Sequence, residues 1–209
     1  MGTKINKEWF EELSSAAPTP GGGGAAALAG AAGASLGMMV ANLTVGKKKY
    51  AAVEEEVKEY RSKLEVLRDE MLYLIEADAE SFAPLAAAYS LPSSTDEEKA
   101  EKEKVMAKVL KEACQVPLRT MEKGEEIIDF IDELSVKGSV MAVSDVGVAA
   151  QFVRTAVLSA SMNVYINTKS MKDKVLAAEY NEKADRLNRE TAEKADRIFA
   201  KIEEGLKCQ

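Results

Sequence analysis

Residues that break helices are scarce in this chain and gather in one segment. The 209 residues include five prolines and 13 glycines, and seven of these glycines lie between Gly21 and Gly37. The rest of the sequence shows no sustained alternation of apolar and polar positions, so it favours long helices over strands. We therefore expect an all-α fold, a multihelical bundle that residues 1–209 form as a single domain.

Six helices are expected from the positions of caps and breakers. They cover about residues 4–15, 24–46, 48–90, 95–135, 144–168 and 172–206. Thr95-Asp96-Glu97-Glu98 is a capping box that opens the fourth helix, and Gly138 favours its end. Pro84 and Pro117 fall inside the third and fourth helices, where we expect a kink or a break.

The chain contains no histidine, which excludes several kinds of site. Ser-His-Asp and Cys-His catalysis, His metal sites and Glu-x-x-His iron sites are all ruled out. Acid–base chemistry must then use Asp, Glu, Lys, Tyr or Cys. The two cysteines, Cys114 and Cys208, lie far apart in the sequence. We expect neither a metal site nor a structural disulfide.

The charge balance and the N-terminus bear on partners and location. The formal net charge of −7 argues against a nucleic-acid partner held by a general basic surface. The first residues lack the apolar core of a signal peptide, so we expect a cytoplasmic protein.

The uncharged run from Leu13 to Gly46 approaches the length of a membrane span. Its residues are mostly Ala and Gly, which transfer weakly into lipid, so we expect a soluble protein without a membrane partner. Small residues let helices approach closely, which places this helix in the middle of a bundle or at a subunit interface. The stretch Ala150–Ile166, with Arg154 as its only charge, should be buried nearly all round.

Asp78 interrupts the apolar face of the third helix. The residues of this face recur at alternating steps of four and three: Val53, Val57, Tyr60, Leu64, Leu67, Met71 and Leu74. The next step falls on Asp78, and a carboxylate there is costly unless it is paired or used. It is either bonded to a basic residue or a helix N-terminus, or it serves a ligand for which the neighbouring alanines leave room.

Further polar residues allow two interpretations each. Asp145 precedes an apolar helical run, so it is either a helix cap or a catalytic carboxylate. Asn163 and Asn167 lie one turn apart and suit either the polar edge of a heterocycle or a neighbouring helix. Lys47–Lys49 follow the uncharged helix. They either place favourable charges at its C-terminus or bind an anion. The glycines 21–24 either seat an anion or let the backbone pass a neighbour closely.

Five motifs in series resemble the formiminotetrahydrofolate cyclodeaminase / methenyltetrahydrofolate cyclohydrolase family across essentially the whole chain. They are Pro18-Thr19-Pro20-Gly21-Gly22-Gly23, Met39-Val40-Ala41-Asn42-Leu43-Thr44 with Gly46–Lys49, Asp78-Ala79-Glu80-Ser81-Phe82, Ser144-Asp145 with Ala149-Ala150, and Asn163-Val164 with Ile166-Asn167. Relatives often carry Asn where this chain has Ser139, so no amide role is expected there. The chain ends where that domain ends, so we expect no attached formiminotransferase domain.

The resemblance implies an all-helical homodimer and a tetrahydrofolate substrate with a glutamate tail, with no metal or other cofactor. The expected activity is methenyltetrahydrofolate cyclohydrolase, formiminotetrahydrofolate cyclodeaminase, or both. Asp145 or Asp78 would carry the proton, with Asp145 slightly favoured. Substrate-binding residues would be Gly21, Gly22, Gly23, Lys47, Lys48, Lys49, Ser144, Asn163 and Asn167, with the lysines on the glutamate tail and the two asparagines on the pterin. The alternatives are a non-catalytic folate-binding helical dimer and a structural or membrane-associated helical protein.

The spacing along the fifth helix limits this assignment. Asp145 and Asn163 are separated by roughly 27 Å if one continuous helix carries both, at 1.5 Å per residue. One small pocket cannot then hold both side chains. Either the helix begins later or is broken, or a long folate runs along it, or two subunits contribute to one site. We favour the shared site.

Overall fold

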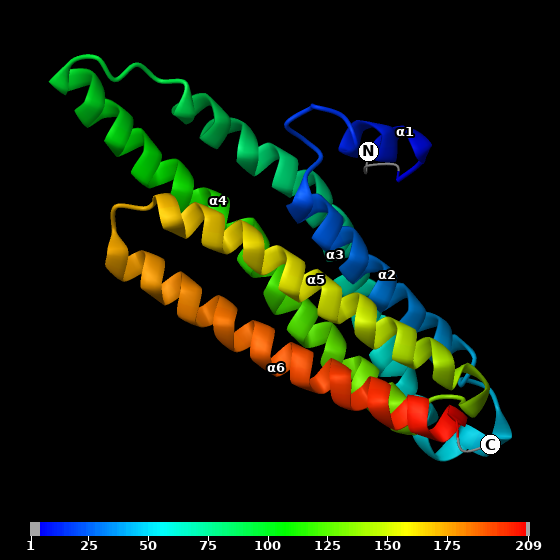
Figure 1. The fold of residues 1–209 in the computed structure, drawn as a ribbon. Coiled ribbons are helices and arrows are strands. Elements are labelled where there is room, and N and C mark those ends of the chain that lie inside the picture. The colour runs from blue at the N-terminus through cyan, green and yellow to red at the C-terminus, as the bar shows by residue number, and fades with distance from the viewer. Residues whose placement is uncertain (1–4, 208–209) are drawn as a thin grey trace.

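A computed structural model describes residues 5–207 and shows an all-α bundle of long helices (Figure 1). The α-helices are α1 (Lys7–Leu13), α2 (Gly22–Asn42), α3 (Glu54–Tyr89), α4 (Asp96–Lys137), α5 (Val143–Ser170) and α6 (Lys174–Lys207), with short 3₁₀ helices at Lys48–Val53 and Val140–Ala142. Among the described residues there is no strand. The expected fold class is confirmed.

The helix α4 begins and ends as its sequence predicts. The Thr95 hydroxyl accepts a hydrogen bond from the Glu98 N–H at 3.2 Å, and the Glu98 carboxylate accepts one from the Thr95 N–H at 3.1 Å. Gly138 follows the last turn as the C-cap. Pro117 and Pro84 lie inside α4 and α3, and neither helix breaks there.

The connection between α2 and α3 differs from the prediction. The second helix ends at Asn42, four residues before Gly46, and the third begins at Glu54 after a 3₁₀ segment. Gly46 has a φ of 78°, a left-handed conformation that glycine adopts without strain and that redirects the chain. Gly46, which the sequence prediction included in the second helix, therefore belongs to the turn that follows it.

The small residues of α2 face its neighbours within the same chain. A Cβ atom on Gly33 would lie 2.7 Å from Val153 Cγ2 of α5, and one on Gly30 would lie 2.7 Å from Met71 Cε of α3. Side chains larger than hydrogen would push these helices apart. The middle of the bundle, one of the two predicted locations for this helix, is confirmed.

Two helical stretches, Gly22–Asn42 and Val140–Ser170, are long and apolar enough by composition to cross a membrane. In this bundle 56% and 44% of their most apolar windows are buried. A core helix of a soluble protein has this property as well. About half of each window remains on the surface of the single chain.

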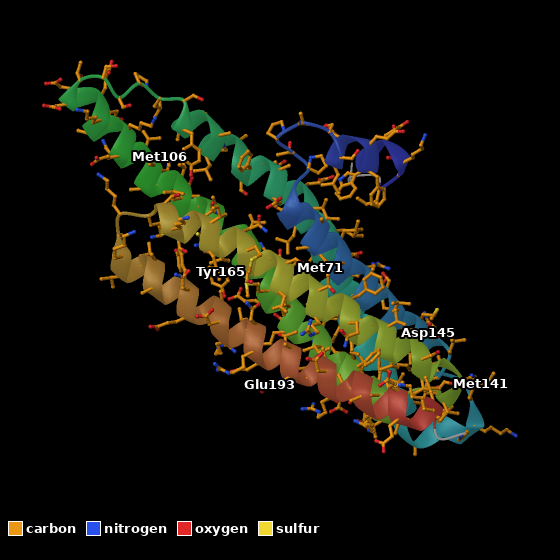
Figure 2. The ribbon with its side chains drawn as sticks, in the orientation of Figure 1. Met71, Met106, Met141, Asp145, Tyr165 and Glu193 are labelled. Carbon is orange, nitrogen blue, oxygen red and sulfur yellow. The ribbon has the colours of Figure 1, made fainter. Side chains whose placement is uncertain are left out.

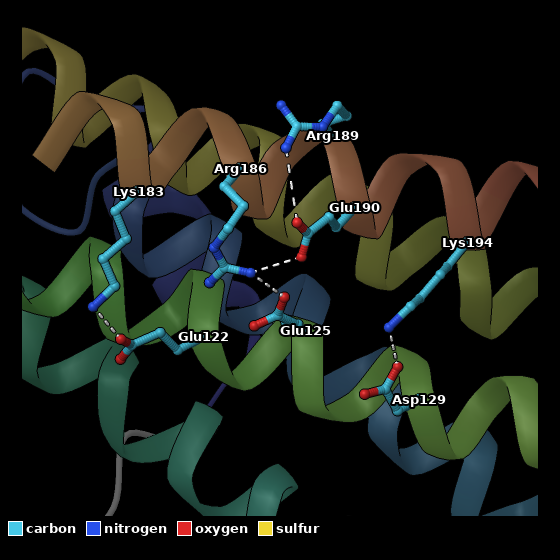
Figure 3. Close-up of polar contacts among 8 residues, drawn as sticks. All are labelled: Glu122, Glu125, Asp129, Lys183, Arg186, Arg189, Glu190 and Lys194. Atoms are coloured by element: carbon cyan, nitrogen blue, oxygen red, sulfur yellow. Dashed lines mark hydrogen bonds and ion pairs between the residues drawn. The ribbon is translucent and has the colours of Figure 1, made fainter. Parts of the chain in front are cut away.

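The apolar face of α3 packs into the core as its spacing predicts. Val57, Leu64, Met71 and Leu74 are buried against residues of α2 and α4. On the opposite side of α4, ion pairs join it to α6: Lys183 with Glu122, Arg186 with Glu125, and Lys194 with Asp129 (Figure 3). Because exposed ion pairs each contribute little free energy, the apolar core holds the bundle while these pairs favour one register of α6 on α4.

Candidate functional site

Asp78, Asn163 and Asn167, which are far apart in the sequence, line one cavity at the N-terminus of α2. Its volume is about 190 Å³, and its walls come from the loop before α2 and from α3, α4 and α5. The lining residues are Pro18, Thr19, Gly21, Gly22, Asp78, Ser81, Phe82, Leu85, Ala113, Asn163, Ile166 and Asn167. The structure thus brings together five of the residues that the sequence suggested for a site.

The Asp78 carboxylate lies against the first turn of α2. Its Oδ2 atom accepts a hydrogen bond from the Gly24 N–H at 2.9 Å. A Cβ atom on Gly23 would lie 2.1 Å from Asp78 Oδ1, so only glycine lets the carboxylate approach this closely. The bond to a helix N-terminus, one of the two predicted explanations for Asp78, is therefore present.

Burial and the helix N-terminus act on Asp78 in opposite directions. Removal from water raises the pKa of the Asp78 carboxyl, and the hydrogen bond from the Gly24 N–H lowers it by less. The net effect is a pKa above the ordinary aspartate value. A carboxyl in this state can exchange a proton closer to neutral pH than an exposed one, as general acid–base catalysis requires.

Asn163 and Asn167 are held by bonds from their amide nitrogens. Asn163 Nδ2 donates to the Ser159 carbonyl at 3.4 Å, and Asn167 Nδ2 donates to the Ala113 carbonyl of α4 at 3.1 Å. Within residues 5–207, neither amide oxygen accepts a hydrogen bond from the protein. Two fixed acceptors one helical turn apart can bind a ligand that presents N–H donors.

Three further lining residues, Ser81, Phe82 and Ile166, are not among the site residues predicted from the sequence. Phe82 follows Asp78 by one helical turn, and Ile166 lies between the two asparagines, so helical spacing alone could have found them. The Ser81 hydroxyl donates to the Asp78 carbonyl at 3.0 Å. Phe82 and Ile166 give the cavity apolar walls beside its polar groups, a combination typical of small-molecule sites.

Asp145 and Ser144 lie at the other end of α5. The N-cap of that helix is Ala142, so Asp145 is not the cap but a residue of the first turn. Ser144 is exposed and lines a separate shallow hollow between α5 and α6. Within residues 5–207, Asp145 forms no ion pair or hydrogen bond.

Lys47 and Tyr50 tie the α2–α3 connection to the segment before α5. Lys47 Nζ donates to the Ser139 hydroxyl at 3.4 Å, and the Tyr50 hydroxyl accepts a hydrogen bond from the Val140 N–H at 3.0 Å. That bond is the main cause that lowers the pKa of Tyr50. Lys48 and Lys49 are exposed. A second group of polar residues therefore lies near Asp145.

The two groups lie far apart in one chain. Helix α5 is unbroken from Val143 to Ser170, so the predictions of a later start or a break are wrong. Asp145 and Asn163 are then separated by roughly 27 Å along the helix axis. Figure 2 shows Asp145 at one end of the bundle and Met106 at the other.

No group of three Cys, Asp or Glu side chains that could hold a metal ion occurs among residues 5–207. Cys114 is free and lies in the core, and burial raises the pKa of its thiol to about 12. It is therefore a poor nucleophile. Cys208 lies outside the described residues.

Comparison with known proteins gives consistent matches. Residues 6–186 match the family described as formiminotransferase-cyclodeaminase. The chain is 40% identical to the methenyltetrahydrofolate cyclohydrolase of Methylorubrum extorquens, over 96% of this chain and 97% of that protein. The crystal structure of formiminotetrahydrofolate cyclodeaminase from Thermotoga maritima superposes with a TM-score of 0.85 at 26% identity, over 97% of this chain and 98% of that one.

Longer relatives match over part of their length. The formimidoyltransferase-cyclodeaminase of Rattus norvegicus is 28% identical over 94% of this chain, which spans 36% of the rat protein. The matches over nearly full length are therefore the more informative ones for the activity of this chain.

Proposed function

Because the chain belongs to the formiminotransferase-cyclodeaminase family, we propose that it is a soluble, cytoplasmic folate enzyme that acts at 5,10-methenyltetrahydrofolate. The activity we favour is methenyltetrahydrofolate cyclohydrolase. The 40% identity to a cyclohydrolase along nearly the whole of both chains carries this choice. The cavity at Asp78 supports it, because it holds a buried carboxyl group with a raised pKa beside two amide groups.

In this reaction a water molecule adds to the methenyl carbon, which carries the positive charge of the amidinium-like centre. Asp78 accepts a proton from that water as the C–O bond forms. The N5–C bond of the tetrahedral intermediate then breaks, its hydroxyl group loses a proton to become the formyl carbonyl, and N5 takes up the proton that Asp78 holds. The product is 10-formyltetrahydrofolate, and one proton is released to solvent overall. The raised pKa of Asp78 suits a group that both accepts and returns a proton.

The pterin is proposed to lie in the cavity beside Asn163 and Asn167. Their free amide oxygens would accept hydrogen bonds from the N–H groups of the pterin, while Phe82 and Ile166 would cover its faces. Gly21 and Gly22 let the ring approach the backbone at the start of α2. The N5 atom of the pterin and the methenyl carbon bonded to it would then lie near Asp78.

Asp145 is proposed to reach this site from a second subunit. Within one chain it lies roughly 27 Å from Asn163, farther than one pocket can span. A homodimer in which the α2 and α5 faces pack against those of a partner would cover the exposed apolar residues of these helices. An anionic Asp145 would then stabilise the cationic carbon. Ser144, the residue before Asp145, would reach the substrate from the second subunit in the same way.

The second candidate activity is formiminotetrahydrofolate cyclodeaminase, favoured by the match to the Thermotoga maritima structure. There N10 attacks the formimino carbon on N5, the tetrahedral intermediate expels ammonia, and 5,10-methenyltetrahydrofolate forms. The same carboxylates would protonate the leaving nitrogen. We propose no metal or redox cofactor for either direction, since both steps need only proton transfer and charge stabilisation.

The direct experiment is to offer 5,10-methenyltetrahydrofolate and 5-formiminotetrahydrofolate separately to the purified protein. Loss of methenyl absorbance faster than in buffer shows the cyclohydrolase, and a gain of methenyl absorbance with release of ammonia shows the cyclodeaminase. Tight binding of both folates without turnover would instead indicate the non-catalytic folate-binding dimer. The Asp78→Asn variant separates enzymatic turnover from the spontaneous hydrolysis of the methenyl compound.

A further inference from the structure

A second and larger cavity lies next to the Asp78 cavity along α4 and α5. Its volume is about 560 Å³, and it is lined by Ser93, Lys99, Ala100, Lys102, Glu103, Lys104, Met106, Ala107, Leu110, Ser170 and Lys172. Leu110 and Ser170 of this cavity each lie three residues from Ala113 and Asn167 of the Asp78 cavity. Three residues of helix rise by roughly 4.5 Å, so the two cavities follow one another within about one turn.

The lining of this second cavity is cationic in a protein of net charge −7. Four lysines face one carboxylate, Glu103, which pairs with Lys172. Lys99 pairs with Asp96 at 3.1 Å. Lys104 has no ion-pair or hydrogen-bond partner among residues 5–207, which leaves at least one positive charge for a ligand.

One lysine has a structural task. Lys102 Nζ donates to the carbonyls of Tyr89 and Leu91, both at 2.8 Å, and so ties the end of α3 to α4. The Tyr89 hydroxyl of α3 also donates to the hydroxyl of Ser170, a residue that lines the second cavity, at 3.5 Å. The lining of the second cavity itself comes from the connection before α4, from α4, and from the end of α5 and the connection that follows it.

Part of the lining of the second cavity is apolar. It consists of Ala100, Met106, Ala107 and Leu110. An occupant that matches this pattern has methylene groups on one side and carboxylates at intervals. A chain of γ-linked glutamate residues has two methylenes and one free carboxylate in each residue.

We propose that this cavity binds the glutamate tail of the folate substrate, with Lys99, Lys104 and Lys172 as the charged contacts. The proposal rests on the proposed function, since it takes the pterin to lie in the Asp78 cavity. Lys104 lies nine residues before Ala113 on α4, roughly 13 Å along the helix axis. A tail that leaves the first cavity along α4 meets these lysines without a second subunit.

This assignment differs from the one that the sequence suggested. Lys47–Lys49 follow the far end of α2, whose 21 residues span roughly 30 Å from the Asp78 cavity. Lysines there could reach a tail from this cavity only as part of a partner subunit. The cationic cavity lies in the same chain and next to the pterin pocket.

The test compares the KM values for 5,10-methenyltetrahydrofolate with one and with three glutamates. The wild-type protein should have the lower KM for the triglutamate. In the Lys99→Gln/Lys104→Gln variant the ratio of the monoglutamate KM to the triglutamate KM should fall about fivefold, with kcat unchanged. Raising the ionic strength should remove the same preference from the wild type. Free tri-γ-glutamate should compete with the triglutamate substrate in the wild type and not in the variant.

A matched control removes the same charge elsewhere. Lys63→Gln/Lys201→Gln changes two exposed lysines outside both cavities and should keep the wild-type preference. Should the double variant fail to fold by circular dichroism, Lys104→Gln alone tests the lysine that has no partner.

Three results would overturn the inference. One is an unchanged preference in the Lys99→Gln/Lys104→Gln variant, and another is a loss of preference only on neutralising Lys47–Lys49. The third is a wild type that turns over both substrates with equal KM, which leaves the proposed function standing. A wild type that turns over neither folate would instead refute the proposed function itself, and with it this inference.

Discussion

At the scale of single residues, Asp78 combines a structural and a chemical part. It accepts the Gly24 N–H at the start of α2, and burial holds the pKa of its carboxyl above the ordinary value. The spacing of apolar residues on α3 was enough to single it out. Its partners could not be predicted, because Gly24 is 54 residues away and only the packed helices bring the two together.

The raised pKa of Asp78 predicts how stability depends on pH. A carboxyl with a higher pKa in the folded state than in the unfolded chain binds more protons when folded. Its contribution to stability is therefore greatest below the unfolded value of about 4 and falls as pH rises through the folded pKa. Asp78→Asn removes this loss of stability at higher pH, and it keeps an oxygen that can accept the hydrogen bond from the Gly24 N–H.

We expect the free energy of unfolding of Asp78→Asn to increase relative to that of the wild type as pH rises from about 4 towards neutrality. Urea unfolding at several pH values measures the difference. A difference that stays constant, or that shrinks with rising pH, would show that the carboxyl is not destabilised by burial.

At the scale of helices, the sequence predicts number, order and most ends. The capping box at Thr95 and the glycine at 138 mark the ends of α4 because each acts on its own helix. The end of α2 was misplaced because the left-handed turn at Gly46 is a matter of backbone direction, which apolar spacing does not report. The prolines did not break α3 or α4, although Pro117 is buried in α4 and Pro84 is exposed on α3.

The close contact of α2 with α5 gives a prediction at this scale. Gly33→Leu places a side chain where a single Cβ atom would already lie 2.7 Å from Val153 Cγ2. Overpacking of this kind costs roughly 1–3 kcal/mol or more, which lowers the melting temperature of a chain of this size by several degrees. Differential scanning calorimetry measures the shift.

Gly205→Leu is the matched control for this substitution. It makes the same change near the end of α6, where a Cβ atom on Gly205 would meet no neighbouring side chain within 4 Å. The melting temperature should change by no more than about 1–2 °C, as for most surface substitutions. Equal effects of the two substitutions would mean that α2 and α5 can separate without cost.

At the scale of the whole molecule, the outer faces of α2 and α5 are apolar. Phe152 is 41% exposed, Met162 59% and Ile166 60%, and α2 carries no charged residue. Surfaces of this kind mark contact sites in soluble proteins. We therefore expect a second copy to cover them, and we expect this contact to bring Asp145 to the Asp78 cavity.

A charge on this face should break the contact. Met162→Glu places a carboxylate at the centre of the proposed interface, where burying it without a partner is costly. We expect sedimentation equilibrium to show a monomer that keeps its helical content and loses turnover. A variant that remains an active dimer would place the subunit contact elsewhere.

The most direct test of the shared site is subunit complementation between Asp78→Asn and Asp145→Asn. Each variant alone should lower kcat by roughly 10²–10⁴ if its carboxylate takes part in the chemistry. When both chains are coexpressed with different tags, a mixed dimer would have one site with both aspartates and one site with neither. Random pairing should then restore about a quarter of the wild-type activity, all of it in the doubly tagged fraction. No recovery in mixed dimers, with both single variants inactive, would contradict the shared site and the proposed part of Asp145 in the Asp78 cavity.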